Sequence, residues 1–109
     1  MNLSKERAGT YLIIEIKESR LDSSNFILLK SSLDKIIKQG ENRLIINLSQ
    51  VGFMDSSGIA GLLPSVRTLA GTGRILLVGL TKTVKQLFNL GKLDRIFDIY
   101  PSVEDALNS

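Results

Sequence analysis

The chain has 109 residues, of which 43% are hydrophobic and 23% charged, and this size and composition fit one globular domain with a single core. Because cysteine and histidine are both absent, the sequence excludes disulfides, a thiolate nucleophile, a Cys/His zinc site and an imidazole general base. The net charge is +3, the cations are scattered among acidic residues and only 6% of residues are aromatic, which argues against direct nucleic-acid binding.

The N-terminal residues 1–10 are polar and do not resemble a signal peptide. No segment approaches the ~18 consecutive apolar residues that a membrane-spanning helix requires. The lack of cysteine fits a reducing compartment. We therefore expect a cytoplasmic, monomeric protein with no membrane insertion, no metal site and no cofactor.

Hydrophobic periodicity at the start of the chain predicts two strands followed by a helix. Residues 11–17 are apolar and β-branched, as in a strand, and a shorter strand is expected over residues 3–7, with a turn at residues 8–10. Apolar residues then recur at helical spacing and predict an amphipathic helix over residues 25–39, which Gly40 ends. Capping groups for this helix are offered by three consecutive polar residues, Asp22, Ser23 and Ser24.

The rest of the chain alternates strands with helices. Short apolar runs predict buried strands over residues 44–48, 75–78 and 96–100. Amphipathic patterns predict helices that begin at residues 55–58, at Thr81 and at Ser102. Pro64 lies inside the first of these helices and is expected to kink it. Residues 49–54 show no such pattern and are expected to be a connection.

The order of these elements, β(β)αβαβαβα, predicts parallel strand pairing with right-handed crossovers. The expected fold is a single α/β domain over residues 1–109, with a mixed, mostly parallel sheet of four or five strands and about four helices. Loops at one end of a parallel sheet cluster together. Residues 22–24 and 55–58 are therefore expected to lie close to one another.

The segment Asp55-Ser56-Ser57-Gly58 joins an apolar stretch to an amphipathic helix. The first turn of a helix has free backbone N–H groups and a partial positive charge, which stabilise an anion such as a phosphate. A phosphoserine brings about −1.5 to −2 charges at pH 7. The same four residues are also an ordinary capping sequence, in which Asp55, Ser56 or Ser57 is the N-cap and nothing more.

A family resemblance is carried by several segments. Residues 53–58, placed between the strand at 44–48 and an apolar helix, resemble the signature of STAS-domain anti-sigma factor antagonists. The resemblance continues through residues 73–78, 83–88 and 90–97. Near the start of the chain, Leu21-Asp22 matches the Leu-Asp pair that precedes the family's first helix. The family often has a glycine and an acidic residue before this pair, whereas this chain has Glu18-Ser19-Arg20.

The resemblance implies a STAS-like domain that acts as a switch and is not an enzyme. The serine directly after the aspartate is the family's phosphoacceptor, which corresponds to Ser56. Its kinase is the partner anti-sigma factor, which the unmodified antagonist binds so that the sigma factor is released, and a serine phosphatase restores the unmodified form. The expected partner-binding residues are Asp22, Ser23, Ser24, Asp55, Ser56, Ser57 and Gly58.

Each of these residues also has a simpler role. Asp55 either orients the acceptor and binds a cationic partner group, or compensates the helix dipole. Ser57 is expected to be a cap, or else an alternative acceptor, and Gly58 leaves room for a partner backbone or serves as a flexible turn residue. Three apolar residues further on are expected to be core rather than a docking ridge, Leu87, Phe88 and Leu90.

Three other functions differ in what they require of the sequence. The chain has no histidine, so it cannot form the Ser-His-Asp relay of a hydrolase. Residues 91–93 lack the serine or threonine that ends a phosphate-binding Walker loop. A phosphorelay receiver needs an acidic pair after the first strand, which residues 15–17 do not provide. A STAS domain that serves as an unphosphorylated scaffold in a lipid-transport or stressosome-type complex stays open as the alternative.

Overall fold

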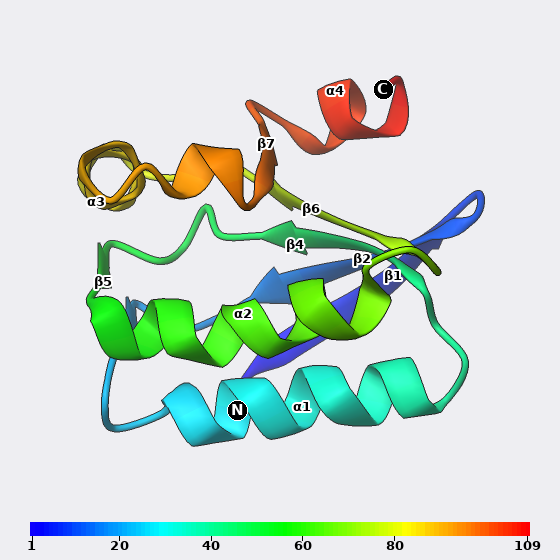
Figure 1. The fold of residues 1–109 in the computed structure, drawn as a ribbon, viewed down its shortest axis with the longest axis horizontal. Coiled ribbons are helices and arrows are strands. Elements are labelled where there is room, and N and C mark those ends of the chain that lie inside the picture. The colour runs from blue at the N-terminus through cyan, green and yellow to red at the C-terminus, as the bar shows by residue number, and fades with distance from the viewer.

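A five-stranded sheet forms the centre of the computed structural model, which describes residues 1–109 (Figure 1). The elements in chain order are β1 (Leu3–Ala8), β2 (Tyr11–Ile16), β3 (Arg20–Leu21), α1 (Phe26–Lys38), β4 (Arg43–Asn47), β5 (Phe53–Met54), α2 (Ser56–Leu69), β6 (Arg74–Val78), α3 (Lys82–Leu90), the 3-10 helix η1 (Leu93–Arg95), β7 (Asp98–Tyr100) and α4 (Val103–Leu107). The strand order is β1-β2-β4-β6-β7, in which β1 is antiparallel to β2 and the other neighbours are parallel. The predicted mixed, mostly parallel α/β fold is confirmed.

Both faces of the sheet are covered, which explains why its central strands read as continuous apolar runs. Leu44, Ile45 and Ile46 of β4 are completely buried. Because side chains alternate between faces, Leu44 and Ile46 join the larger core on the side of α1 and α2, whereas Ile45 faces the other way. On that second face, Ala106 of α4 closes a smaller cluster.

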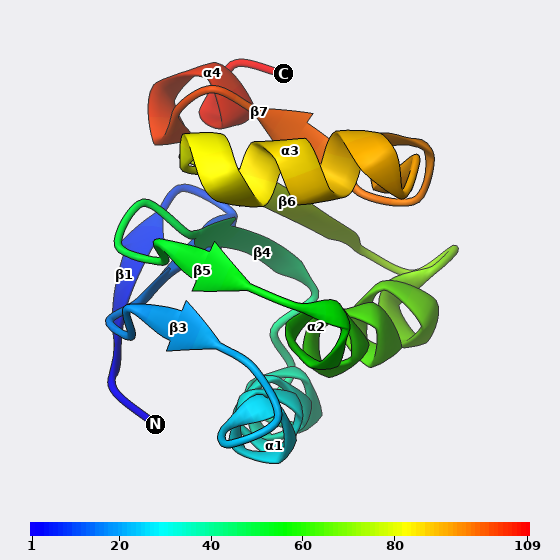
Figure 2. The ribbon, with the colours of Figure 1, turned by 90° about the vertical axis from the view of Figure 1, so that its left-hand side faces the viewer.

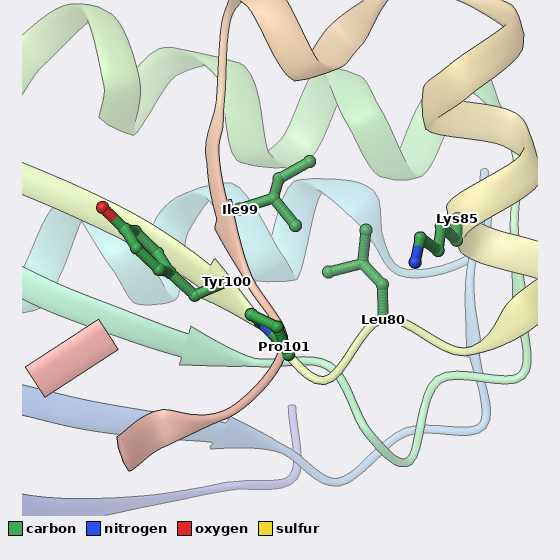
Figure 3. Close-up of a pocket in the computed structure, with 5 residues that line it drawn as sticks. All are labelled: Leu80, Lys85, Ile99, Tyr100 and Pro101. Atoms are coloured by element: carbon green, nitrogen blue, oxygen red, sulfur yellow. The ribbon is translucent and has the colours of Figure 1, made fainter. Parts of the chain in front are cut away.

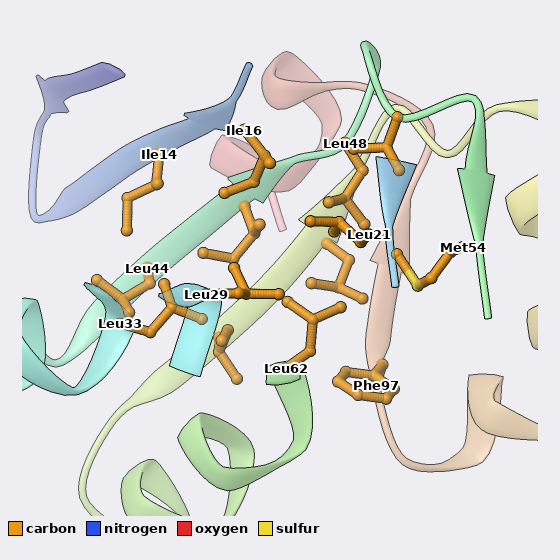
Figure 4. Packing of buried hydrophobic residues seen from close by; sticks show 14 of the residues in the cluster. Ile14, Ile16, Leu21, Leu29, Leu33, Leu44, Leu48, Met54, Leu62 and Phe97 are labelled. Atoms are coloured by element: carbon orange, nitrogen blue, oxygen red, sulfur yellow. The ribbon is translucent and has the colours of Figure 1, made fainter. Parts of the chain in front are cut away.

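The larger core lies between the sheet and the helices α1 and α2 (Figure 4). Leu33 of α1, Leu62 of α2 and Ile14 of β2 are completely buried in it, and each such burial contributes about 1.5–3 kcal/mol. The two helices run in the same direction, so their N-termini lie at the same end of the molecule (Figure 1). They approach closely at Gly61, where an added Cβ would lie 2.9 Å from the carbonyl oxygen of Phe26.

Residues 20–21 and 53–54 form a second, two-stranded parallel sheet that the sequence patterns did not predict. Its strands, β3 and β5, are too short to show a period of two. Leu21 and Met54 are buried, whereas Arg20 and Phe53 face solvent. Figure 2 shows this small sheet beside the start of α2. The expectation that residues 49–54 only connect two elements is therefore wrong for the last two of them.

The C-terminal part also departs from the prediction. β7 begins at Asp98, because residues 93–95 form a 3-10 turn and Phe97 packs into the core, with its ring centroid 5.5 Å from that of Phe88. Leu90 is 85% exposed, so its helical spacing predicted a core position wrongly. It follows Phe88 by two residues, which places it on the outer side of α3.

The helix starts differ from the prediction in detail. α1 begins at Phe26 with Asn25 as its N-cap, so none of the three polar residues before Asn25 caps it. Thr81 precedes α3 as predicted, but its hydroxyl donates to the carbonyl of Val51 at 2.8 Å instead of capping the helix. α2 continues through Pro64 without interruption.

Candidate functional site

The small sheet of β3 and β5 places the two predicted site loops side by side. Leu21 pairs with Met54 in a parallel register, so the chain leaves both strands at the same end. The N–H of Asp55 donates to the carbonyl of Leu21 at 3.3 Å, which ties the second loop to the end of the first strand. Asp22 and Asp55 therefore occupy equivalent positions directly after the two strands, so the first residues of the two predicted site loops start side by side.

Asp55 is the N-cap of α2. Its backbone is extended, and its Oδ1 accepts hydrogen bonds from the N–H groups of Ser57 at 2.9 Å and Gly58 at 3.3 Å. This geometry satisfies two of the N–H groups that the first turn of a helix leaves free. The prediction that Ser57 is the cap is therefore wrong, and Ser57 is instead the second residue of the helix.

Ser56 is the first residue of α2 and is exposed to solvent. Its hydroxyl makes no hydrogen bond within the chain, so nothing holds it in one rotamer and nothing shields it. Ser57, the alternative acceptor, is half-buried. The chain has no histidine, and no hydrogen bond joins the Ser56 hydroxyl to a carboxylate or an amine that could deprotonate it.

Gly58 is buried, and its missing side chain serves the protein's own packing. A Cβ at this position would lie 2.5 Å from the carbonyl oxygen of Leu21 and 2.6 Å from the Cγ atom of Met54. The room that was expected to admit a partner backbone is therefore filled by β3 and β5. Gly58 instead sets how closely α2 approaches this small sheet, and so where Ser56 stands.

Residues 22–25 form a turn that Asp22 and Asn25 hold together. The Oδ1 of Asp22 accepts hydrogen bonds from the N–H and the hydroxyl of Ser24, while the Oδ1 of Asn25 accepts from the N–H of Asp22 at 3.0 Å. The side-chain amide of Asn25 also donates to the carbonyl of Arg20 at 2.8 Å. Ser23 and Ser24 are exposed on this turn. The sequence analysis missed Asn25, although asparagine is a common turn-forming residue.

Arg20 lies over the outer face of the small sheet. Its guanidinium carbon is 4.4 Å from the centroid of the Phe53 ring, and its Nε is 3.1 Å from the Oδ2 of Asp22. The hydrogen bonds from Ser24 and the contact with Arg20 lower the pKa of Asp22 below its usual value. Arg20 and Phe53 are thus exposed neighbours of the predicted site. The only sequence signal for this pair is that residues 18–20, which include Arg20, depart from the family pattern.

Other kinds of site are not evident. No group of three or more acidic residues is placed to hold a metal ion. The larger of two surface hollows, about 340 Å³, is lined by Leu80, Lys85, Ile99, Tyr100 and Pro101, at the ends of β6 and β7 rather than at Ser56 (Figure 3). No helix combines the length and the apolar character needed to cross a lipid bilayer.

Comparison with known proteins gives a consistent result. A candidate anti-sigma factor antagonist of Thermotoga maritima is 26% identical over 98 residues, which are 88% of this chain and 87% of that protein. The unphosphorylated form of the anti-sigma factor antagonist SpoIIAA is similar in structure, with a TM-score of 0.77 and 25% identity over 98% of this chain and 94% of the other. The phosphorylated form of the Bacillus cell fate determinant SpoIIAA gives a TM-score of 0.69 and 24% identity, over 98% and 97% of the two chains.

The fold and the site agree with a match that extends over almost the whole sequence. The model of the STAS domain family matches residues 2–106, which include β3, β5 and the start of α2. This chain belongs to the STAS domain family.

Proposed function

We propose that the protein is an anti-sigma factor antagonist of the cytoplasm that is switched by phosphorylation of Ser56. The unmodified protein binds an anti-sigma factor that is also a serine kinase, and the sigma factor is released. Phosphorylation of Ser56 ends this binding, and a serine phosphatase restores it. The observation that carries the proposal is the exposed and unbonded hydroxyl of Ser56 at the start of α2.

The chemistry of the site requires a partner enzyme. The hydroxyl of Ser56 is hydrogen-bonded to no base, and the Oδ1 of the neighbouring Asp55 already accepts two backbone N–H groups, so the kinase supplies the base as well as ATP and Mg²⁺. The hydroxyl stands at the end of the molecule where the loops of residues 22–24 and 55–56 meet, and a kinase can reach it without unfolding the domain. Exposed Ser23 and Ser24 border the same surface.

The expected effect of the phosphate is electrostatic. Phosphorylation adds about −1.5 to −2 charges, next to the carboxylates of Asp55 and Asp22, and lowers the net charge of the chain from +3 to about +1. A partner surface that fits the unmodified site then meets a new, strongly hydrated anion, which opposes binding through charge and desolvation. Because Asp55 keeps its own capping bonds, we expect no refolding of α2.

The comparison with SpoIIAA supports this scheme. The chain is similar to that antagonist in both its unphosphorylated and its phosphorylated form, over 98% of its own length in each case. Both forms share the fold of this chain. A switch that adds charge while keeping the fold is therefore compatible with the architecture described above.

The proposal is tested by capturing partners from cells of the source organism with three immobilised proteins: wild type, Ser56→Ala and Ser56→Asp. We expect the first two to retain a protein with a kinase domain and Ser56→Asp to lose it. The purified partner should then transfer phosphate from ATP to wild type and not to Ser56→Ala. Ser57→Ala is the matched control, since it removes a hydroxyl one residue away. Equal phosphorylation of Ser56→Ala, or equal retention by all three proteins, contradicts the proposal.

A further inference from the structure

A phosphate on Ser56 finds few donors left at the start of α2. The N–H groups of Ser57 and Gly58 donate to the side chain of Asp55, and the N–H of Ile59 donates to the backbone carbonyl of Asp55. Only the N–H of Ser56 itself carries no bond. The positive end of the helix is thus already occupied by a carboxylate. It has fewer free N–H groups and less uncompensated positive charge for a phosphate than an uncapped helix has.

The charges around Ser56 are mainly negative. Asp55 precedes it, and Asp22 occupies the equivalent position on the adjacent loop. Among residues 20–25 and 51–58, Arg20 is the only cation. On the two segments that form the small sheet and its loops, a phosphate with two negative charges therefore has one cation that can compensate it.

Arg20 is free to take this role. Its side chain is 60% exposed, and only its Nε donates to Asp22 while its two terminal nitrogens make no hydrogen bond. Through its Nε the guanidinium contacts Asp22, which directly follows β3 as Asp55 directly follows β5. Exposed ion pairs are weak, whereas a guanidinium binds phosphate through two parallel hydrogen bonds, so the exchange of partners is favourable.

We propose that Arg20 binds the phosphate of phosphorylated Ser56 and leaves the ring of Phe53 to do so. This inference rests on the proposed function, because it assigns a residue to the phosphorylated state of the same site. Phosphorylation then changes two features of the partner-facing surface at once. It adds an anion at Ser56, and it removes a cation from above the ring of Phe53, a residue that is 38% exposed in the unmodified protein.

The test uses the full chain with phosphoserine incorporated at position 56 during synthesis, so that no cellular kinase is needed. In proton–nitrogen NMR spectra, the Nε–Hε signal of Arg20 should move on phosphorylation, and the ring protons of Phe53 should lose the influence of the guanidinium. The same phosphorylated chain with Arg20→Gln should show no such change at Phe53. Lys17→Gln removes another exposed cation just before β3 and is the matched control.

A second measurement follows removal of the phosphate by a non-specific phosphatase. Phosphate held by Arg20 should be removed about two- to fivefold more slowly than from the Arg20→Gln protein, which is the size of effect that an exposed ion pair supports. Arg20→Lys should restore part of the protection, and Lys17→Gln should keep all of it. Unchanged Arg20 and Phe53 signals, or equal rates with and without Arg20, would overturn the inference. The proposed function would then still stand, because it does not depend on where the phosphate binds.

Discussion

Replacing Gly58 with alanine tests whether this glycine sets the position of Ser56, the proposed phosphorylation site. The added Cβ would lie 2.5 Å from the carbonyl oxygen of Leu21, 2.6 Å from the Cγ of Met54 and 3.0 Å from the Cβ of Leu21. The first of these atoms belongs to the backbone of β3, so it cannot move aside as the end of a flexible side chain can. α2 must therefore shift away from β3 and β5.

The expected magnitude follows from two opposing effects. Overpacking a tight interface costs about 1–3 kcal/mol, and occasionally more. Alanine in place of glycine inside a helix returns at most about 1 kcal/mol. The contact with a backbone atom puts the cost at the upper end, so we expect a net loss of about 1–2 kcal/mol in the free energy of unfolding. With a urea m-value of about 1.5 kcal/mol per molar, the midpoint falls by about 1 M.

The assay is equilibrium urea unfolding of Gly58→Ala beside wild type, with Ser56→Ala as the control. Ser56 is exposed and unbonded, so its replacement should change stability by less than about 0.5 kcal/mol. If Gly58→Ala is as stable as wild type, the close approach of α2 to the small sheet is not a constraint. The argument that Gly58 fixes the place of Ser56 would then be wrong.

Three further predictions concern the capping residue, the turn beside the site and the outer face of α3. Asp55→Ala should lower stability by about 1 kcal/mol in thermal unfolding while Asp55→Asn retains most of it, because an amide oxygen can still accept from the first turn; equal losses would show that charge rather than capping matters. The pKa of Asp22 is lowered in the folded state, so its stabilising contribution is complete above the unfolded pKa of about 3.9 and is lost as pH falls through the folded value. Urea unfolding between pH 2 and 6 should therefore show a shallower loss for Asp22→Asn than for wild type, and parallel curves would refute this. Phe88→Ala should lower the free energy of unfolding by about 3–5 kcal/mol, because Phe88 is buried. Leu90→Ser should lower it by less than about 0.5 kcal/mol, because Leu90 is 85% exposed. Similar losses for the two variants in urea unfolding would contradict the assignment of Leu90 to the surface.

The central sheet and the four helices could be predicted because their signals are long. The apolar run at residues 44–48 and the helical spacing after Ile59 each extend over several residues, and burial on both faces or on one face leaves a clear pattern. The antiparallel pair at the start of the chain was also predicted, since a turn containing Gly9 separates two strand-like segments; this glycine has a φ of +61°, in the left-handed region that favours glycine.

The small sheet could not be predicted for the opposite reason. β3 and β5 have two residues each, which is too few for an alternation to be visible, and their pairing depends on residues more than 30 positions apart. Local capping choices were equally ambiguous. Asp55, Ser56 and Ser57 have similar capping propensities, and only the extended backbone of Asp55 decides between them. Asn25 was overlooked because its role comes from two contacts across a turn rather than from a helix pattern.

The position of Leu90 shows a related limit. Periodicity places a residue on a face of a helix only while the helix continues, and α3 ends at Leu90. The next residues turn away, with Lys92 in the left-handed region at a φ of 54°, and the core beneath this end is filled by Phe97 instead. An apolar residue in the last turn of a helix is therefore a weaker indication of burial than one in its middle.

The site combines fixed parts with an exposed hydroxyl, and this division determines what the proposed phosphorylation of Ser56 would do. Asp55 is held by two hydrogen bonds, Gly58 is enclosed by Leu21 and Met54, and the turn after Asp22 is closed by side-chain contacts. The hydroxyl of Ser56 projects from this frame without a hydrogen bond, as the exposed hydroxyl of Ser23 also does. A phosphate placed there has no packing to disrupt, so its effect on a partner must come from charge and hydration, and from any exposed side chain that turns toward it. A modification of this kind changes which surfaces the protein can bind while the fold that presents Ser56 stays the same.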